Sequence, residues 1–441
     1  MCTDKSETDM TVNRQHAEDK DEDQTGSGHS CCCLKGAVGT ILSCTAIFFS
    51  FSLVDQWITT KDEALGYTAD WGESGQREVR RVYTGVSSIA TIFAALISLK
   101  VGYRIVAISG CLMMMCGMFV ASWLDKAAIG LIGVLIGGIA GVGASCLKLV
   151  AVVPVLENID NCRFIAVGVV NIGGACASVI HYGIMSIDDV NLNWRLLYRW
   201  QIVIMIFALF VSLRLGSTNE KWIKTYYSPF DWSILHQKSL YILMTVLLLD
   251  RFGQFILSKE IFTFFDTSDS SSAPYLGGFF YYGGQILGPV FMFCCIKKEI
   301  VSTLCFMGPI AFISGIWTIG ATWSTNLLHI SIYAAILGIS KVAFTTLLQN
   351  LIPTVYGKKN VRIVKGLLEF SAGVGILLSS PCQYAVGMSY DEVERYKPAF
   401  YLAGCALVLA SGFVFLCVQV VRETEDYAKV SVVNEIAMEE T

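Results

Sequence analysis

Residues 128–155 read AIGLIGVLIGGIAGVGASCLKLVAVVPV, a stretch of 28 residues in which Lys148 is the single charged side chain. A helix of about 20 apolar residues crosses the hydrocarbon core of a bilayer. Gly133, Gly137 and Gly141 recur at every fourth position, which places them on one helix face where a neighbouring helix can approach closely. The stretch therefore predicts a membrane-spanning helix that is packed tightly inside a helical protein.

The whole chain has the composition of a membrane protein. Of its 441 residues, 54% are hydrophobic and 15% charged, whereas soluble domains carry about 25% charged residues. The net charge of −4 provides no basic field, so we expect no nucleic-acid partner. Because the chain has five histidines and contains no HExxH, GxSxG or Walker-type motif, we predict no enzyme, no metal site and no cofactor.

Apolar runs separated by charged breaks predict twelve membrane spans. These lie at about 36–56, 82–99, 105–124, 128–155, 164–186, 200–216, 239–264, 274–296, 300–320, 327–352, 363–388 and 398–421. The predicted fold class is an all-α membrane protein with twelve transmembrane helices in two six-helix bundles. The expected organisation is a disordered cytosolic tail (1–33), a first bundle (34–216), a cytosolic linker (217–237), a second bundle (238–421) and a cytosolic tail (422–441).

Two similar stretches support duplication of the halves. PVLENIDNCRFIAVG begins at Pro154, and PTVYGKKNVRIVKG begins at Pro353. In both, a span ends near proline, turns through a polar loop, and restarts at an arginine, Arg163 or Arg362, that is followed by glycine. Secondary transporters are built from repeated halves with the substrate site between them.

Basic residues indicate the orientation of the spans. Lys100, Arg104, Lys358 and Lys359 lie in short loops that follow even-numbered spans. By the positive-inside rule, both termini are expected to be cytoplasmic. The juxtamembrane residues Cys31, Cys32 and Cys33 suit palmitoylation, with unmodified thiols as the alternative.

Few charged residues fall inside the predicted spans. Each costs at least about 2.5 to 3.5 kcal/mol at mid-bilayer and therefore needs a partner or a function. Asp250 and Arg251 lie near the middle of the seventh span, and their side chains are expected to diverge by about 100° around the helix. A guanidinium binds a carboxylate through two hydrogen bonds, so Arg251 is the candidate partner for a substrate carboxylate and Asp250 for an ammonium.

The supporting candidates for a substrate site are Gln254, Lys341 and Glu369. The alternative interpretation is structural: ion pairs between neighbouring helices, such as Asp250 with Lys341 or Arg251 with Glu369.

Two further charges are expected outside the site. Lys148 is predicted to extend its ammonium toward the membrane interface, and Asp55 is expected to be interfacial. The aromatic run from Phe279 to Tyr282 is expected to pack between helices.

The chain resembles the major facilitator superfamily. KVGYR, from Lys100 to Arg104, is similar to the D-R-x-G-R-R loop between the second and third spans of that family; Gly102 and Arg104 match, and Leu99 occupies the place of the acidic residue. The resemblance implies the six-plus-six major facilitator fold, with Gly102 and Arg104 in a cytoplasmic gate.

Finer features resemble L-type facilitative amino-acid transporters and apicomplexan amino-acid transporters. In these, a span ends in S-L-V, an L-G-Y-F-A-D-like segment follows, and the next span begins with arginine. The matching residues are Ser52, Leu53, Val54, Leu65, Gly66, Tyr67, Ala69, Asp70, Arg80 and Arg81. The resemblance implies a plasma-membrane carrier of cationic, aromatic or large neutral amino acids that works by alternating access.

Two alternatives stay open. Residues 133–181, with Asn193, Trp194 and Arg195, also resemble proton-linked monocarboxylate transporters, although Asp55 stands about where those proteins have a lysine. The second alternative is a transporter-like receptor or scaffold that carries no solute. The endocytic-type motif from Tyr427 to Val430 fits that class and a carrier equally well.

Overall fold

The computed structural model describes residues 26–59, 72–124, 128–159, 162–185, 194–215, 232–266, 273–295, 300–323, 326–387 and 396–439, and every regular element in these ranges is a helix. In a bilayer each buried N–H and C=O group must be paired within the protein, and a helix pairs them within one segment. The long apolar runs of this chain therefore form helices.

The N-terminal half comprises the helices up to residue 214. They are α2 (Gly26–Thr59), α3 (Gly72–Ile89), α4 (Thr91–Ala121), α5 (Ile129–Ile132), the π-helical segment η2 (Gly133–Ala140), α6 (Gly141–Asn158), α7 (Arg163–Met185) and α8 (Trp194–Arg214). Helix α3 continues into the start of α4, and the chain reverses within α4 at Gly102, whose φ of 79° is favourable for glycine. Segments α5, η2 and α6 follow one another as a single pass.

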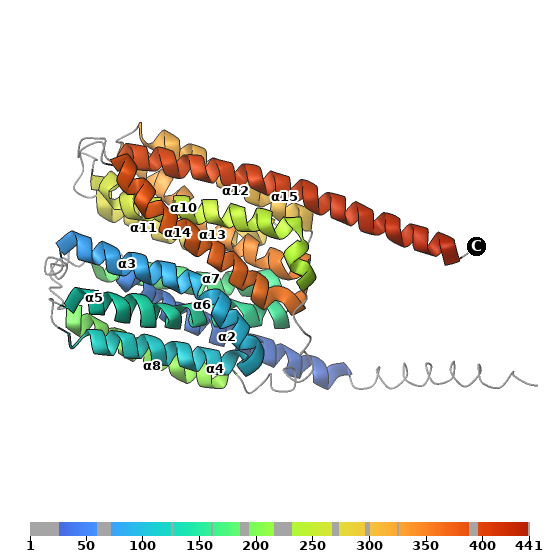
Figure 1. The fold of residues 1–441 in the computed structure, drawn as a ribbon, viewed down its shortest axis with the longest axis horizontal. Coiled ribbons are helices and arrows are strands. Elements are labelled where there is room, and N and C mark those ends of the chain that lie inside the picture. Colours follow the sequence, from blue (N-terminus) through green and yellow to red (C-terminus); the bar gives the residue numbers. More distant parts are fainter. Residues whose placement is uncertain are drawn as a thin grey trace, which may run out of the picture.

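The C-terminal half begins after the short 3-10 helix η3 (Trp232–His236). Its helices are α10 (Lys238–Asp266), α11 (Ala273–Cys295), α12 (Ile300–Ala321), α13 (Leu327–Tyr356), α14 (Val361–Gly387) and α15 (Tyr396–Glu439), with the 3-10 turn η4 (Lys358–Asn360) between α13 and α14. The start of α2 and the end of α15 lie at the same end of the molecule (Figure 1). We call this the basic end, because Lys100 and Arg104 near the Gly102 turn and the lysines of η4 lie there.

These helices agree with the predicted all-α class and its twelve spans. In the described ranges, nine helical passes are long and apolar enough to cross a membrane, and α3, α11 and α14 run beside them. The largest differences are at the ends. The second pass starts at Gly72 rather than near 82, α2 starts at Gly26 within the expected N-terminal tail, and α15 continues to Glu439 through most of the expected C-terminal tail.

Some sequence predictions fall outside the described residues. The side chains of Cys31, Cys32 and Cys33 are outside them, as are residues 60–71, which contain the outer-loop motif from Leu65 to Asp70. The palmitoylation of those cysteines stays a prediction.

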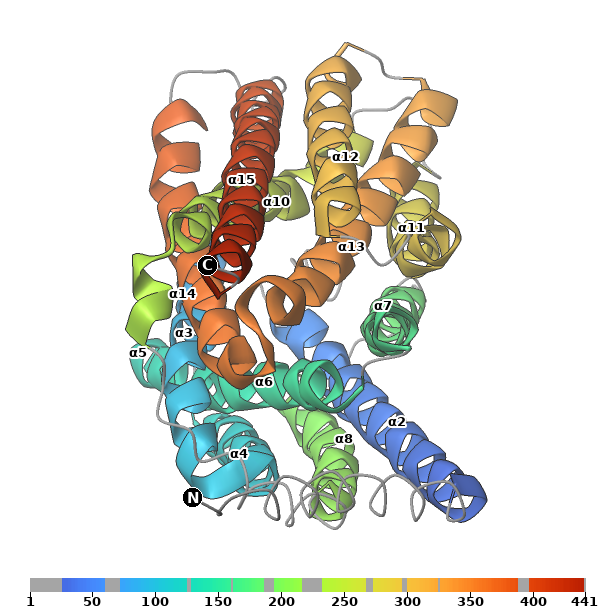
Figure 2. The ribbon, with the colours of Figure 1, turned by 90° about the vertical axis from the view of Figure 1, so that its right-hand side faces the viewer.

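The two halves meet along two groups of helices. Seen end-on in Figure 2, α3 and the first part of α4 lie against α14, and on the other side of the molecule α7 lies against α11 and α13. Helices α6 and α13 lie between these two contacts. Residues of α2, α6, α10, α13 and α14 can therefore face one another across the interface between the halves.

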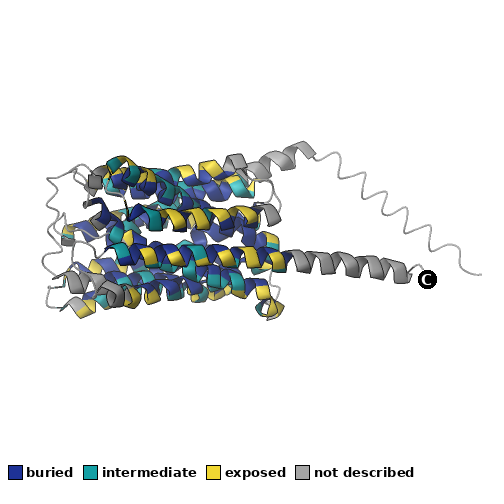
Figure 3. Cartoon of the chain, turned by 90° about the horizontal axis from the view of Figure 1, so that it is seen from above, coloured by how far each residue is buried: buried dark blue, intermediate teal, exposed yellow. Residues whose placement is uncertain are grey.

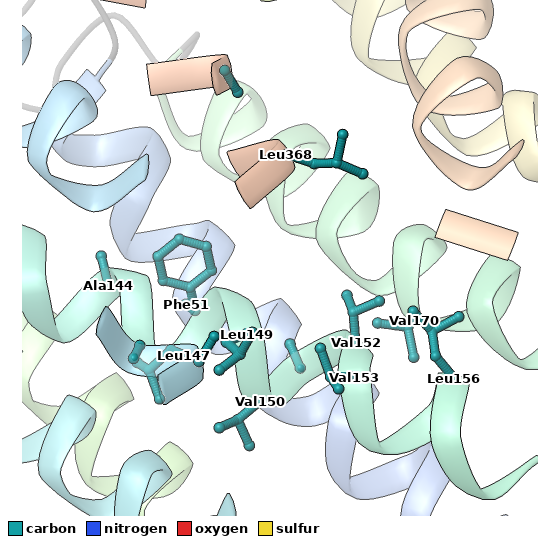
Figure 4. Packing of buried hydrophobic residues seen from close by; sticks show 14 of the residues in the cluster. Phe51, Ala144, Leu147, Leu149, Val150, Val152, Val153, Leu156, Val170 and Leu368 are labelled. Atoms are coloured by element: carbon teal, nitrogen blue, oxygen red, sulfur yellow. The ribbon is translucent and has the colours of Figure 1, made fainter. Parts of the chain in front are cut away.

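Apolar residues occupy both the interior and the outer surface. Exposed residues lie along the outer faces of the helices (Figure 3), and they include large hydrophobic side chains such as Phe93, Phe210 and Phe312. An apolar exterior of this extent is expected of a surface that contacts lipid. In the interior, buried side chains of α6 pack with Phe51 of α2 and Val170 of α7, and Leu368 of α14 belongs to the same cluster (Figure 4).

Glycines bring several helices into close contact. A Cβ on Gly137 or Gly141 would meet Val82, Tyr83 or Val86 of α3, and Gly133 faces Val79 of the same helix. The predicted packing face of the fourth span is therefore confirmed, with α3 as its partner. Helices α11 and α13 are held together in the same way: a Cβ on Gly284 would lie 2.5 Å from the Ala335 carbonyl oxygen, and one on Gly338 would collide with the Tyr281 carbonyl.

We expect Gly338→Ala to destabilise the protein by about 1–3 kcal/mol, because the added methyl group has to displace a backbone carbonyl of α11. The measurement is thermal unfolding of the purified protein in detergent. Gly283→Ala, on α11, is the matched control: nothing lies within 4 Å of its Cβ position, so its midpoint should stay unchanged. Equal midpoints for both variants would contradict this close approach.

Candidate functional site

Two charges of the N-terminal half face the other half. Asp55 lies on α2 and Lys148 on α6, and the charges of Lys148 and Lys341 both act on the Asp55 carboxyl. Lys148 Nζ donates a hydrogen bond to the Ser87 hydroxyl at 2.9 Å and lies 5.9 Å from the centre of the Phe51 ring. The Lys148 side chain therefore points into the protein and not toward the membrane interface, so the placement expected for it was wrong. The interfacial placement of Asp55, four residues before the end of α2, stays a prediction.

Helix α10 contributes Asp250 and Arg251. Asp250 is 3% exposed, and its Oδ2 lies 3.8 Å from Arg251 Nε. The two side chains thus approach each other although successive positions point in different directions, because the long arginine chain can turn back along the helix. Arg251 also donates to the Thr345 hydroxyl of α13 at 2.9 Å. The guanidinium therefore joins α10 to α13.

Lys341, on α13, lies beside this pair. Its charge acts on Asp250 as well as on Asp55. Its Nζ donates to the Tyr281 hydroxyl of α11 at 3.1 Å. Tyr281 therefore belongs to the site, although the sequence placed it among packing residues.

Glu369, on α14, lies near charged residues of both halves. It accepts a hydrogen bond from Lys365 at 2.5 Å, and the charges of Lys148 and Arg251 both act on its carboxyl. Arg251 and Asp250 are in contact, and the other charges act on one another in an order of alternating sign: Asp55, Lys148, Glu369, Arg251, Asp250, Lys341 and Asp55 again. We call these six side chains the charged ring.

The charged ring draws side chains from both halves. Its three cations balance its three anions, and Lys365 adds one positive charge through its ion pair with Glu369. Charges are costly in a medium of low dielectric constant unless they are paired. The ring therefore provides charges of both signs at the interface between the halves.

The structure brings together four of the five residues predicted for a substrate site: Asp250, Arg251, Lys341 and Glu369. The fifth, Gln254, lies one turn beyond Asp250, is 5% exposed, and has a buried Oε1 atom without a hydrogen-bond partner among the described residues. Sequence reasoning left out Asp55 and Lys148. Both are charged residues within predicted spans, and this feature of the sequence could have identified them as candidates.

At the basic end the halves are joined by an arginine clamp. Arg362, at the start of α14, donates from Nε and Nη2 to the two carboxylate oxygens of Glu157 on α6, at 2.8 and 2.9 Å. It also donates to the Ser98 carbonyl oxygen at 3.0 Å and stacks 4.2 Å from the centre of the Tyr103 ring. Arg362, Glu157, Ser98 and Tyr103 are the basic-end clamp.

The repeated stretches noted in the sequence meet in this region. Arg163, at the start of α7, donates to the Thr354 hydroxyl near the end of α13 at 3.1 Å, and Arg362 reaches the end of α6. In each half, an arginine at the start of one helix therefore contacts the end of a helix in the other half. The two similar stretches of sequence therefore occupy corresponding positions in the two halves.

A buried amide adds a third contact between the halves. Asn171 of α7 is 4% exposed, and its Nδ2 donates to Thr346 Oγ1 and Gln349 Oε1 of α13, both at 2.9 Å. Buried polar groups need hydrogen-bond partners, and here Asn171 and α13 provide them for each other. The contact therefore favours this one arrangement of the two halves.

The predicted gate residues lie next to the clamp. Gly102 is buried at the turn of α4, and Arg104 is exposed just after it. The turn places Tyr103 against Arg362. Glu157 and Arg362 were not predicted as gate residues, although Arg362 lies in one of the two similar stretches of sequence.

Among the described residues, no group of three His, Cys, Asp or Glu side chains lies close enough together to hold a metal ion.

Comparisons with known proteins identify the fold. No protein-family model and no curated protein sequence matches the chain. Among solved structures, a variant of the E. coli fucose:proton symporter is similar with a TM-score of 0.61 at 11% identity, over 86% of this chain and 98% of the symporter. The chain therefore has the major facilitator fold, as its sequence predicted, and with its apolar helices it is a multi-pass membrane protein.

Proposed function

We propose that this protein is a secondary transporter that moves amino acids across a membrane by alternating access. The observation that carries the proposal is the charged ring, in which groups of both signs from the two halves act on one another. A zwitterion needs a cationic partner for its carboxylate and an anionic partner for its ammonium, and the ring offers both. The substrate classes we favour are cationic, aromatic or large neutral amino acids, as the sequence resemblance implies.

The ring also supports alternating access. Secondary transporters of repeated architecture bind their substrate at the interface of the repeats and rock the halves around it. Because the ring draws side chains from both halves, movement of one half against the other would change the contacts of a bound solute. The basic-end clamp, together with Gly102 and Arg104, is proposed to gate one side of the site.

The proposed location follows the sequence. The start of α2, the end of α15 and the basic turns lie at the basic end, and the positive-inside rule supports a cytoplasmic location for this end. We propose the plasma membrane as the site of function, on the resemblance to amino-acid transporters.

The ring argues against a neutral sugar. The similar solved structure belongs to a symporter of fucose, but charged side chains within apolar helices are costly and a neutral solute would need none of the six. A monocarboxylate is the stronger competitor, because the ring and Lys365 together carry one excess positive charge.

Uptake into proteoliposomes tests the proposal. The purified protein is expected to carry labelled L-leucine or L-arginine with saturable kinetics, and a competition screen with all twenty amino acids should single out one class. Unlabelled L-fucose should not compete. If lactate or pyruvate enters in a pH-dependent manner and no amino acid does, the monocarboxylate function replaces this one.

A further inference from the structure

An aromatic cluster lies in the C-terminal half where α10 ends and α11 begins. Phe264 and Phe265 come from the end of α10, and the centre of the Phe264 ring lies 5.1 Å from that of Phe400 near the start of α15. Tyr281 and Tyr282 of α11 belong to the same cluster. Each of these residues is at most 7% exposed, so this part of the half is closely packed.

Tyr182 of the N-terminal half joins this cluster. Helix α7 starts at the basic end with Arg163, so Tyr182, close to the last residue of α7, lies at the opposite end. Its ring packs against the cluster, with its centre 5.3 Å from that of Tyr282, and occupies the space that a Cβ on Gly278 would fill. Helices α7 and α11 can be seen side by side in Figure 2. The missing side chain at Gly278 therefore admits a ring from the other half.

Each side of this contact is held by its own half. In the N-terminal half, His181, next to Tyr182, is 2% exposed and packs edge-on against Trp57 of α2, with the ring centres 4.4 Å apart. In the C-terminal half, the Tyr281 carbonyl lies against Gly338 of α13. A movement of one half against the other at this end therefore has to part Tyr182 from α11.

We propose that the Tyr182 ring, seated on Gly278 and against Tyr282, is a latch that closes the molecule at the end opposite the basic end. The latch lies beside the charged ring, because Tyr281, one turn after Gly278, accepts the hydrogen bond from Lys341 at 3.1 Å. The basic end is closed by an ion pair, whereas this end is closed by aromatic packing. The role of the latch in transport rests on the proposed function, but the contact itself can be tested without a substrate.

Hydrogen exchange followed by mass spectrometry tests the latch in the purified full chain. In Tyr182→Ala, residues 178–184 and 277–284 should exchange roughly tenfold faster than in the wild type, because the aromatic packing that favours the closed state is lost. Residues 152–159 and 353–366, at the basic end, should exchange no faster. Faster exchange at both ends would indicate a general loss of stability and overturn the proposal, as would unchanged exchange at the latch.

Substitutions of Gly278 test the seat of the ring. Gly278→Ala should accelerate exchange in the same two segments, because its methyl group collides with the Tyr182 ring. Gly278→Ala combined with Tyr182→Ala should exchange no faster than Tyr182→Ala alone, since the ring is then absent. Gly283→Ala, on the same helix with nothing within 4 Å of its Cβ position, is the control and should behave as the wild type. If the effects of the two substitutions instead multiply, Gly278 is not the seat and the proposal fails.

Tyr182→Phe separates the ring from its hydroxyl group. Because the ring is kept, this variant should retain the protection of the wild type. Acceleration equal to that of Tyr182→Ala would assign the contact to the hydroxyl and overturn an aromatic latch.

Transport kinetics test what the latch does. In proteoliposomes, Tyr182→Ala should lower kcat for the transported amino acid roughly tenfold, since the closed state becomes less populated, and it should not raise KM. A raised KM with unchanged kcat would make Tyr182 a binding residue and overturn the latch. If the wild type carries no amino acid, the proposed function fails, and the exchange measurements alone decide whether the latch exists.

Discussion

Arg251→Gln is expected to abolish uptake of the transported amino acid, with a fall in kcat/KM of at least about a hundredfold. The guanidinium is the nearest cation to Asp250, which is 3% exposed. Removing one partner of a buried ion pair typically costs about 3–5 kcal/mol, because the other charge stays buried without compensation. Initial rates in proteoliposomes, normalised to the amount of inserted protein, measure the loss.

The double variant distinguishes a structural ion pair from a substrate site. If Asp250 and Arg251 serve only to stabilise one another, replacing both by Asn and Gln removes both charges and should restore uptake and thermal stability. If the pair contacts substrate, stability should return but uptake should stay lost. We expect the second result. Arg214→Gln, at an exposed arginine that ends α8, is the matched control and should transport normally.

The positions of the helices could be predicted because a membrane span is a local property of the sequence. The ninth span was expected at 300–320, and α12 runs from Ile300 to Ala321. Hydropathy marks the edge of the membrane and not the end of the helix, however. Helix α15 therefore passes through Val421, where the apolar run stops, and ends at Glu439.

The site was only partly predictable because the sequence does not give the rotation of each helix or its neighbours. Asp250, Arg251, Lys341 and Glu369 stood out because a charge deep in a span is costly. Lys148 also lies in a span, but its long side chain allowed a second interpretation, and only the packing of α6 against α3 brings it to Ser87. The same holds for the basic-end clamp, whose charged partners Glu157 and Arg362 are 205 positions apart.

The basic-end clamp supports the second large prediction. Arg362→Gln should remove the ion pair and the hydrogen bond to the Ser98 carbonyl, and thereby favour separation of the halves at the basic end. Hydrogen bonds to charged groups contribute about 1.5–3 kcal/mol, so the population of the separated state should rise roughly tenfold to hundredfold. Hydrogen exchange followed by mass spectrometry measures the opening, as faster exchange in residues 152–159 and 353–366.

The partner variants make this prediction specific to the clamp. Glu157→Gln should increase exchange in the same two segments, because Glu157 provides both carboxylate oxygens. The charge swap Glu157→Arg with Arg362→Glu should restore protection only in part, since a glutamate at 362 would face the Ser98 carbonyl and the Tyr103 ring, which both favour a cation. Arg163→Gln, which removes the exposed hydrogen bond to Thr354, should have a smaller effect. If Arg362→Gln opens the basic end no more than Arg163→Gln does, the clamp does not hold the halves together, and the buried contact of Asn171 with α13 becomes the stronger candidate.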